Sequence, residues 1–422
     1  MDRPIRFEGG STKDMILTGG TTPWTFLNNE PVAKYPRLEN KVHCDVLVIG
    51  GGISGAAMAY VLTKQGVNTV LLEKGRVCGG STSANAGLLQ FANDRMLSEL
   101  IQRFNEQQGK AFYRMCRDAV NRLSDIAGEL SIDSSFTERN SLYYASTPED
   151  AGKLRHEYDI LKRCGFDVEY WDRERIKAAF PFAKEAALYT RGDAEVNPYL
   201  LGHGMLKDAS LQGLRIYEDS EVLDCIYTDS SVVAHTQRGA VTAKQAVWAG
   251  GYSMQDWKPD RQVVLTNTYA IMTEPVSDLS SWHERALLWE SGKPYLYFRT
   301  TPDHRIMAGG LDEPPPPSGR PYQFMKERSD RLLKEIGRMF PELEGVRMAC
   351  AWAGIFASTK DGMPLIGRHP EYPSSYFMEV YGGNGTVFSM IAAELLAEAI
   401  AGREPEALAW LSLTRPVEIK NE

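Results

Sequence analysis

The segment 45–55, DVLVIGGGISG, is the sequence feature that most constrains the fold of this chain. Apolar and β-branched residues lead directly into glycines spaced GxGxxG, at Gly50, Gly52 and Gly55. In a strand–turn–helix unit the first glycine permits the sharp turn, the second lets the backbone approach a pyrophosphate, and the third lets helix and strand pack closely. A helical pattern to Gln65 and a second apolar strand follow. This order of elements predicts a dinucleotide-binding βαβ unit.

Glu73 lies at the end of the second predicted strand, 18 residues after Gly55. A carboxylate at about this spacing accepts hydrogen bonds from the ribose hydroxyls of an adenosine and would repel a phosphate on that ribose. The helix that begins at the glycine turn directs its free amide groups, and the positive end of its dipole, toward the pyrophosphate. The unit is therefore predicted to bind FAD or NAD in preference to NADP.

The composition excludes several classes of partner. With 43% hydrophobic residues, 24% charged residues and a formal net charge of −8, the chain has no broad basic region, so neither nucleic acid nor a membrane is expected as a partner. The N-terminus lacks a signal peptide's apolar core, and no apolar stretch is long enough to span a bilayer, which predicts a cytoplasmic location. The six cysteines are far apart and form no CxxC or Cys/His cluster, so buried thiols and no metal site are expected.

Two insertions interrupt the dinucleotide-binding pattern. Between Asn93 and Leu130, apolar residues recur at helical spacing and predict two amphipathic helices. Farther along, the segments 265–274, 294–300 and 305–310 have the pattern of strands in an antiparallel sheet. Two interleaved domains, one of them doubly wound, are therefore predicted. Because ligands bind at the carboxyl ends of the strands in such open sheets, the substrate is expected between the domains.

Three further motifs accompany the glycine turn. The segment 80–88, GSTSANAGL, directly follows the strand that ends at Glu73. The other two are 352–367, WAGIFASTKDGMPLIG, and 381–387, YGGNGTV, which leads into an apolar helix. With the glycine turn, these motifs resemble the D-amino-acid-oxidase-like (DAO) family of FAD-dependent flavoproteins, and within it the group of glycine, sarcosine and γ-glutamylputrescine oxidases. The resemblance spans residues 45–401.

The resemblance implies FAD as the cofactor and an α/β fold built from alternating segments. A Rossmann-like FAD-binding domain would be interleaved with an α+β substrate domain built on an antiparallel sheet. The FAD-binding domain would comprise residues 42–93, 185–258 and 346–422, the substrate domain residues 94–184 and 259–345, and the N-terminal leader residues 1–41.

The resemblance also assigns residues to the cofactor. The loop 80–88 would reach the pyrophosphate and the edge of the flavin ring through backbone amides, and the loop 382–386 would face the pyrimidine carbonyl of the ring. Val222 would contact the adenine, and Ala249 and Gly250 would pass close under the cofactor. The residues implied to bind FAD are Gly50, Gly52, Ile53, Ser54, Gly55, Glu73, Lys74, Ser81, Thr82, Ala86, Gly87, Leu88, Val222, Ala249, Gly250, Gly354, Gly382, Gly383, Asn384, Gly385, Thr386 and Val387.

Two departures from glycine oxidase-like sequences concern the substrate. Those sequences have arginines where this chain has Phe356 and Gly383, so both side chains that would grip an α-carboxylate are absent. A lysine of sarcosine oxidases is likewise replaced by Val387. A free small amino acid is therefore not expected as the substrate. Phe356 would line an apolar channel, hold a substrate ammonium over its ring, or belong to the core.

Tyr295, Phe356 and Asn384 make up the predicted catalytic set. Tyr295 falls where glycine oxidase-like proteins carry an active-site tyrosine, and it is predicted to form a hydrogen bond with the substrate. The two-residue period of a strand places Tyr297 and Arg299 on the same face as Tyr295. Because Arg299 lies beside a turn, a surface ion pair is expected for it.

No residue is expected to attach the flavin covalently. The cysteine that does so in sarcosine oxidases would fall near Gly354, and Cys350 is four residues away along a predicted strand, so FAD is predicted to be dissociable. His203, His283 and His304 have no metal-spaced or triad partner in the sequence and are expected to be solvated or to cap a helix or turn.

The predicted function is that of an FAD-dependent amine oxidoreductase. A hydride would leave the carbon beside a neutral amine nitrogen of a small primary or secondary amine, and the imine would hydrolyse in water. Dioxygen is expected as the electron acceptor, although the lysine that sarcosine oxidases hold over the flavin falls near Met307, so another carrier stays open. One alternative is a hydroxy-acid or glycerol-phosphate dehydrogenase, for which Arg299, Arg305 or Lys293 would have to turn into the pocket. The other is a flavin-binding subunit or sensor without turnover, and the oligomeric state stays open.

Overall fold

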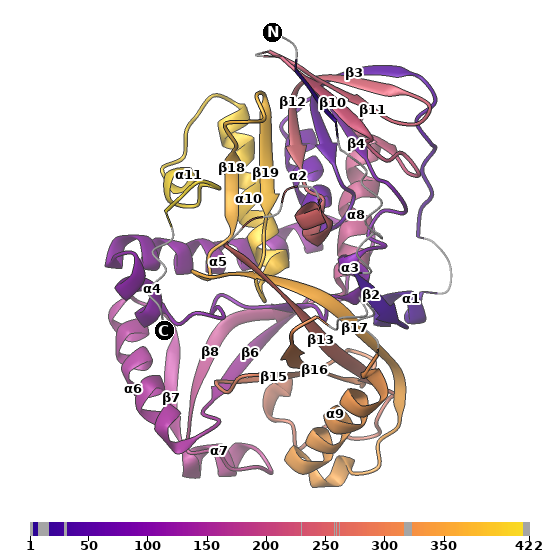
Figure 1. Cartoon of the computed structure of the whole chain (residues 1–422). Coiled ribbons are helices and arrows are strands. Elements are labelled where there is room, and N and C mark those ends of the chain that lie inside the picture. The colour runs from indigo at the N-terminus through magenta and orange to yellow at the C-terminus, as the bar shows by residue number, and fades with distance from the viewer. Residues whose placement is uncertain are drawn as a thin grey trace.

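The computed structural model describes residues 3–6, 17–28, 32–228, 230–256, 258, 260, 262–315 and 323–416 of the chain (Figure 1). Two β-sheets, one in the upper and one in the lower half of Figure 1, are both flanked by helices. Strands of the two sheets alternate along the sequence, so the chain passes between the sheets several times. The site described below is lined by residues from both sheets.

The first sheet has a parallel centre. β3 (Lys41–Ile49) pairs in parallel with β4 (Thr69–Leu72) and β12 (Ala240–Trp248), and Ile49 at its end lies opposite both Leu72 and Trp248. The carboxyl ends of these three strands therefore meet at one edge of the sheet. The other strands are β1 (Arg3–Arg6), β9 (Arg215–Tyr217), β10 (Asp224–Tyr227), β11 (Val232–His235), β18 (Leu365–Arg368) and β19 (Ser375–Glu379).

The second sheet is almost entirely antiparallel, with one parallel pair between β6 and β14. Its strands follow the order β2, β17, β13, β16, β15, β14, β6, β8, β5, and β7 pairs with β8. Their bounds are β2 (Thr18–Gly20), β5 (Leu88–Leu89), β6 (Thr137–Tyr144), β7 (Val168–Asp172), β8 (Ala186–Glu195), β13 (Val263–Thr273), β14 (Leu287–Glu290), β15 (Leu296–Thr300), β16 (Ile306–Glu313) and β17 (Met348–Thr359).

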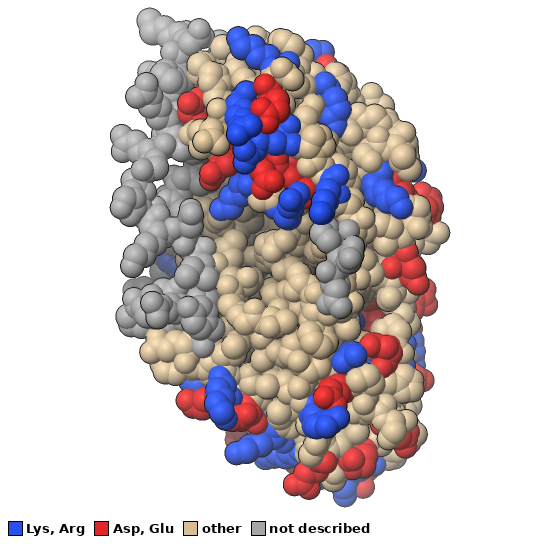
Figure 2. Space-filling view, turned by 90° about the vertical axis from the view of Figure 1, so that its right-hand side faces the viewer, with Lys and Arg blue, Asp and Glu red and all other residues tan. Residues whose placement is uncertain are grey.

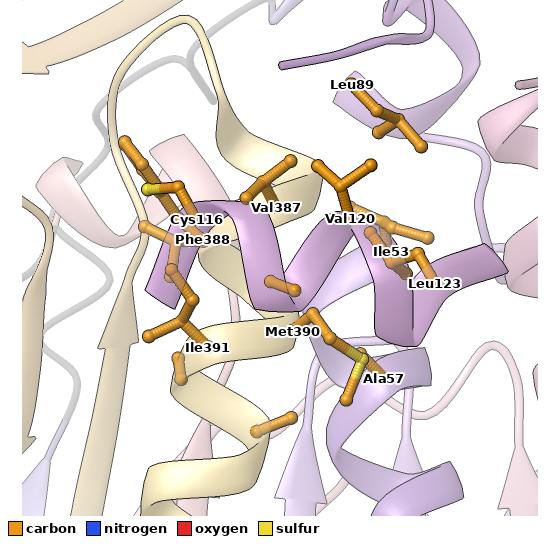
Figure 3. Packing of buried hydrophobic residues seen from close by; sticks show 14 of the residues in the cluster. Ile53, Ala57, Leu89, Cys116, Val120, Leu123, Val387, Phe388, Met390 and Ile391 are labelled. Carbon is orange, nitrogen blue, oxygen red and sulfur yellow. The ribbon is translucent and has the colours of Figure 1, made fainter. Parts of the chain in front are cut away.

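Three helices form the core beside the first sheet (Figure 3). α10 (Gly385–Ile400) packs against α2 (Ile53–Lys64) and against α5 (Glu106–Glu129), and α2 also packs against α8 (Pro198–Leu211). The contact between α10 and α5 includes Phe388 and Phe112, whose ring centroids are 5.5 Å apart. Each fully buried side chain of this kind contributes about 1.5–3 kcal/mol to folding. The core therefore fixes the N-termini of α2 and α10 relative to each other.

The remaining helices lie mainly on the second sheet and at its edges. They are α1 (Pro23–Leu27), α3 (Ser81–Ala84), α4 (Leu97–Arg103), α6 (Pro148–Arg163), α7 (Arg173–Ala179), α9 (Met325–Met339) and α11 (Ala407–Trp410), with short 3₁₀ helices at Gly251–Asp256, His283–Arg285 and Pro341–Leu343. The helices expected between Asn93 and Leu130 are α4 and α5.

The predicted fold class is confirmed, since a Rossmann-like α/β unit is interleaved with an α+β unit on an antiparallel sheet. Two strands belong to a different sheet from the one expected for their segments. β8 and β17 fall within residues 185–258 and 346–422, but β8 pairs with β6 and β7, and β17 pairs with β13, all in the second sheet. Sheet membership is decided by the neighbours that satisfy a strand's backbone groups, and a segment boundary does not reveal those neighbours.

The described part of the leader joins both sheets. β1 pairs with β10 in the first sheet, β2 pairs with β17 in the second, and α1 buries the indole of Trp24, which is 3% exposed. The Trp24 indole nitrogen donates a hydrogen bond to the carbonyl oxygen of Asn85 at 2.7 Å. This segment thus reaches one of the loops that the sequence assigns to the cofactor.

The cysteines are buried free thiols, as predicted, but the expectation for His203 is wrong. His203 is 2% exposed in α8 and packs on Tyr199 with ring centroids 4.4 Å apart. Neither ring nitrogen has a hydrogen-bonding partner among the described residues, and burial lowers the pKa of His203 to about 4. A helix buried on most sides leaves no solvated position for this ring. His304 lies exposed in a turn, as predicted.

Charged side chains are unevenly spread over the face on the right-hand side of Figure 1. Lys, Arg, Asp and Glu gather above and below, and a hollowed zone of uncharged residues lies between them (Figure 2). In the described part of the chain, no helix combines the length and the apolar character needed to cross a membrane.

Candidate active site

A cavity of about 500 Å³ is lined by residues from both sheets. The strand ends Ile49, Leu72 and Trp248 contribute from the first sheet, and Tyr297 of β15 and Phe356 of β17 from the second. Ligands of open parallel sheets bind outside the carboxyl ends of the strands, which is where this cavity begins.

The glycine turn between β3 and α2 has the geometry that its sequence predicts. Gly50 has φ +107°, and a Cβ atom there would lie 2.4 Å from the carbonyl oxygen of Ala249. A Cβ atom at Gly55 would lie 1.8 Å from the carbonyl oxygen of Gly50. Side chains at these positions would push the helix away from the strand, so the N-terminus of α2 reaches the cavity only because they are absent.

Glu73 is held in place by backbone amides. Its Oε2 accepts the Gly51 N–H at 2.7 Å, and its Oε1 accepts the Gly75 N–H at 2.8 Å. Burial raises the pKa of Glu73, while these two amides and Lys74 oppose that effect. Each carboxylate oxygen keeps a further lone pair, and the side chain lines the cavity. The position suits an acceptor of ribose hydroxyls.

The second glycine-containing loop, 80–88, is tied to both sheets. The Thr82 hydroxyl oxygen accepts the Ile53 N–H at 2.9 Å and so caps the first turn of α2. The Asn85 amide oxygen accepts the Gly87 N–H at 2.8 Å, and its Nδ2 donates to the Thr386 hydroxyl at 3.1 Å. The loop is therefore fixed to the N-termini of α2 and α10.

Arg299 does not form the surface ion pair that we expected. Its side chain is buried, and Nη1 donates to the carbonyl oxygens of Gly87 at 2.6 Å and Val196 at 3.0 Å. Glu195 is the acidic group nearest to it, with Arg299 Nε and Glu195 Oε2 3.8 Å apart. Gly87 directly precedes β5 and Val196 directly follows β8, so the guanidinium is bound by the ends of two other strands of the same sheet. Arg299 thus holds the loop 80–88 from behind and does not line the cavity.

The loop 381–385 and the N-terminus of α10 form another wall. The Gly382 N–H donates to the Ala357 carbonyl oxygen at 2.9 Å, and the Gly383 N–H donates to Asp94 Oδ2 at 2.8 Å. The Asn384 side chain is 6% exposed, and its Nδ2 donates to the carbonyl oxygens of Gln90 and Ala92 at 2.6 and 3.1 Å. Asn384 therefore spans two loops. The amides that remain to face a ligand are those of the first turn of α10.

Most of the predicted residues meet at this cavity. Tyr295, Phe356 and Asn384 line it, and so do all the predicted cofactor-binding residues except Gly55, Thr386 and Val387. Gly55 acts through helix packing, as described above. Thr386 is 3% exposed and bonded to Asn85, and Val387 is 0% exposed in the core of Figure 3. The rotation of about 100° per residue in a helix turns these two side chains away from the cavity, which the linear motif does not show.

Further aromatic side chains, to which the sequence assigned no role, line the cavity. Tyr252 lies 6.4 Å from Phe356 and 5.6 Å from Tyr381, measured between ring centroids. Trp289 and Tyr297 also line the cavity. Tyr252 directly follows the paired glycines after β12, and this position next to predicted cofactor-binding residues could have identified it from the sequence.

The charged side chains that line the cavity lie in two places. Among its described lining residues, the charged ones are Glu73, Lys74, Arg76 and Glu221 near the end of β4 and the Val222 loop, and Asp94 beside Gly383. Arg299, Arg305 and Lys293 are not part of the lining. The aromatic end therefore has no guanidinium or ammonium group. Within the described residues, no group of three His, Cys, Asp or Glu side chains is placed to hold a metal ion.

The residues present suit FAD. The cradle admits backbone only at Gly50, the carboxylate of Glu73 lies at one end, and a helix N-terminus lies at each of two walls. Helix N-termini with free amides stabilise phosphates and other anionic groups. The flavin ring would then reach the aromatic end, between Gly354 and the first turn of α10.

Comparisons with known proteins agree with this geometry. Residues 45–399 match the family DAO, FAD dependent oxidoreductase. The chain is 27% identical to glycine oxidase of Bacillus subtilis over 86% of this chain and 95% of that protein. It is 26% identical to gamma-glutamylputrescine oxidoreductase of Escherichia coli over 92% of this chain and 90% of that protein.

A solved structure has the same fold. The crystal structure of glycine oxidase from Geobacillus kaustophilus matches with a TM-score of 0.75 at 23% identity, covering 89% of this chain and 100% of that one. The match extends over both sheets, because so little of either chain lies outside it.

Proposed function

Because the chain belongs to the DAO family of FAD-dependent oxidoreductases, we propose that it oxidises the C–N bond of a primary or secondary amine that carries no carboxylate at the reacting end. The aromatic end of the cavity carries this proposal. It contains Phe356 and Gly383 and no cationic side chain among the described lining residues. A planar guanidinium that could bind a carboxylate with two parallel hydrogen bonds is absent there.

Bound FAD supplies the acceptor of a hydride from the carbon beside the amine nitrogen. The chain contributes binding and position. Tyr295 would donate a hydrogen bond to the substrate, and Phe356 with Tyr252 would pack on its apolar part and exclude water. Burial raises the pKa of the Tyr295 hydroxyl well above its ordinary value, so it remains protonated and able to donate near neutral pH. The first turn of α10 would stabilise negative charge through its free amides.

FAD is proposed to be dissociable, and dioxygen is proposed as the acceptor. Of the six cysteines, Cys78 alone is among the described residues that line the cavity. It is buried near Glu73, at the opposite end from Phe356. Acid precipitation should therefore release the yellow cofactor into the supernatant. Oxygen consumption with one hydrogen peroxide formed per amine oxidised would support an oxidase. Little or no peroxide would show that the protein is a dehydrogenase that passes electrons to another acceptor.

The test of the amine assignment is anaerobic bleaching of the bound flavin. The panel contains primary and secondary alkylamines, a γ-glutamylated amine, glycine, lactate and glycerol 3-phosphate. Amines should bleach the flavin at least tenfold faster than glycine. Bleaching by lactate or glycerol 3-phosphate and by none of the amines would overturn the proposal.

The contribution of Tyr295 can be separated from general damage with a matched variant. Tyr295→Phe should slow flavin reduction by the best amine about tenfold, as expected for one lost hydrogen bond of about 1.4 kcal/mol. Tyr372→Phe makes the same chemical change outside the cavity and should leave the rate unchanged. Equal rates for the two variants would show that the Tyr295 hydroxyl does not form the proposed hydrogen bond with the substrate.

A further inference from the structure

Asp94 places a carboxylate at the aromatic end of the cavity. It follows the loop 80–88 and lines the cavity beside Gly383. Its Oδ2 accepts the Gly383 N–H at 2.8 Å, whereas Oδ1 has no hydrogen-bonding partner among the described residues. This residue has no role in the function proposed above.

Asp94 lies against Gly383, so a side chain at position 383 would require the carboxylate to move. A Cβ atom on Gly383 would lie 2.6 Å from Asp94 Oδ1 and 3.2 Å from its Cγ. The space that a longer side chain would enter is therefore filled by the carboxylate. Where glycine oxidase-like sequences place a positive charge, this chain places a negative one.

The environment favours a ligand cation. Asp94 is exposed at the surface of the cavity, and the protein around it raises the pKa of its carboxyl by desolvation, while the Gly383 amide, Lys293 and Arg95 oppose that effect. Neither Lys293 nor Arg95 comes within 4 Å of the carboxylate. A carboxylate that is open to the cavity and has no ion-pair partner among the described residues can pair with a ligand cation that carries its own hydrogen-bond donors.

Aromatic rings complete the surroundings. The negative charge of Asp94 raises the pKa of the Tyr295 and Tyr252 hydroxyls, after the larger effect of burial, so both tyrosines lie within its field. Tyr252 in turn contacts Phe356 and Tyr381. An ammonium group bound by an acid near aromatic rings gains from the ion pair, and also from a cation–π contact where it lies over a ring face.

We propose that Asp94 binds a second, cationic nitrogen of the substrate, so that the substrate class is a diamine or polyamine. This inference rests on the amine oxidation proposed above. The nitrogen held by Asp94 is not the reacting one, because a neighbouring carboxylate stabilises the protonated form of an amine and hydride loss requires the neutral form. The reacting nitrogen belongs to the other end of the molecule.

The test measures binding without turnover. The holoenzyme is first reduced with dithionite under anaerobic conditions, so that it cannot oxidise an amine, and is titrated calorimetrically with 1,4-diaminobutane and with butylamine. Wild type should bind the diamine at least about tenfold more tightly than the monoamine, the factor expected for one charge-assisted contact. Asp94→Asn keeps the shape and the Gly383 contact and should reduce that ratio to near one.

A matched variant controls for net charge. Glu99→Gln also removes one negative charge near Asp94, keeps the first turn of α4 capped, and lies outside the cavity lining. It should leave the preference for the diamine unchanged. An equal loss of preference in Glu99→Gln and Asp94→Asn would overturn the inference, because it would show a general field effect.

The pH dependence gives an independent readout. Affinity for the diamine should fall as pH decreases through the raised pKa of Asp94, and this dependence should be weaker in Asp94→Asn. The titratable and charged groups that face Asp94 are Lys293, Arg95, Tyr143, Tyr252, Tyr295 and Asp312. The tyrosines do not ionise in this range, and Asp312, whose pKa burial raises to about 6, is present in both proteins and contributes equally to both. If wild type binds butylamine as tightly as the diamine while monoamines bleach the flavin, this inference fails and the amine assignment stands. If no amine bleaches the flavin, the proposed function itself fails.

Discussion

Replacing Arg299 by methionine should destabilise the fold and weaken cofactor binding at the same time. The guanidinium is 1% exposed and donates to the carbonyl oxygens of Gly87 and Val196, and through Nε to that of Thr300 at 3.1 Å. Methionine keeps the length of the side chain and removes every donor. The carbonyl oxygen of Val196 then loses this donor, and that of Gly87 keeps only the Val196 N–H.

The magnitude follows from these contacts. A hydrogen bond from a charged donor contributes about 1.5–3 kcal/mol, and removing a buried charge from its partners typically costs about 3–5 kcal/mol in total. Glu195 keeps Arg139, whose Nη2 lies 3.0 Å from Glu195 Oε1, so the loss stays within that range. Because Gly87 lines the cavity, release of the loop 80–88 should also raise the dissociation constant of FAD about tenfold or more.

The assay is urea unfolding with saturating FAD, followed by tryptophan fluorescence, together with a fluorescence titration of the apoprotein with FAD. Arg347→Met is the matched control, because Arg347 pairs with Glu274 at the surface and its side chain is 80% exposed. The control should lose about 0–1 kcal/mol and keep its affinity for FAD. If Arg299→Met unfolds within about 0.5 kcal/mol of Arg347→Met, Arg299 does not hold the loop as described.

Three further outcomes are expected. Gly55→Ala places a Cβ atom 1.8 Å from the carbonyl oxygen of Gly50 and should yield protein without FAD. The control Gly128→Ala changes an exposed position of α5, where a Cβ atom would have no neighbour within 4 Å, and should retain FAD. The visible absorbance of the purified variants measures the bound flavin. Burial raises the pKa of Asp193 to about 6, so this carboxyl should cost wild type stability as pH rises from about 4 to 6, by about 3 kcal/mol in the limit. Asp193→Asn should lose less by that amount over the same range, since Asp312, with its pKa raised to about 6, titrates in both proteins; melting temperatures across this range test it. Arg415→Met breaks a buried ion pair with Asp361 and should cost about 3–5 kcal/mol in urea unfolding, more than the double variant that also replaces Asp361 by leucine.

The strand–turn–helix unit could be predicted because its determinants are local. The glycine spacing, the apolar run before it and the acid at the end of the next strand all lie within residues 45–73, and the structure reproduces each of them. The motifs 80–88 and 381–387 converge on the same cavity. Their convergence follows from the fold, which short-range patterns identify as a whole.

Contacts between distant segments could not be predicted in the same way. Asp94 and Gly383 are 289 residues apart and come together through the arrangement of α10 and the loop before α4. Arg299 likewise is buried by its bonds to Gly87 and Val196, more than 100 residues away along the chain, whereas the turn beside it suggested a surface position. The sequence assigned no role to Asp94 and the wrong environment to Arg299, because in both cases the partner comes from a distant segment.

The close approach of Asp94 to Gly383 should couple the evolutionary substitutions at these two positions. An arginine introduced at 383 on its own would force the carboxylate to move, since a Cβ atom would lie 2.6 Å from the present position of Oδ1. Its guanidinium would then pair with Asp94 in place of a substrate carboxylate. A lineage that gains a working carboxylate clamp at 383 should therefore also lose the acid at 94, and surveys of natural variants should rarely find arginine at the one site together with an acid at the other.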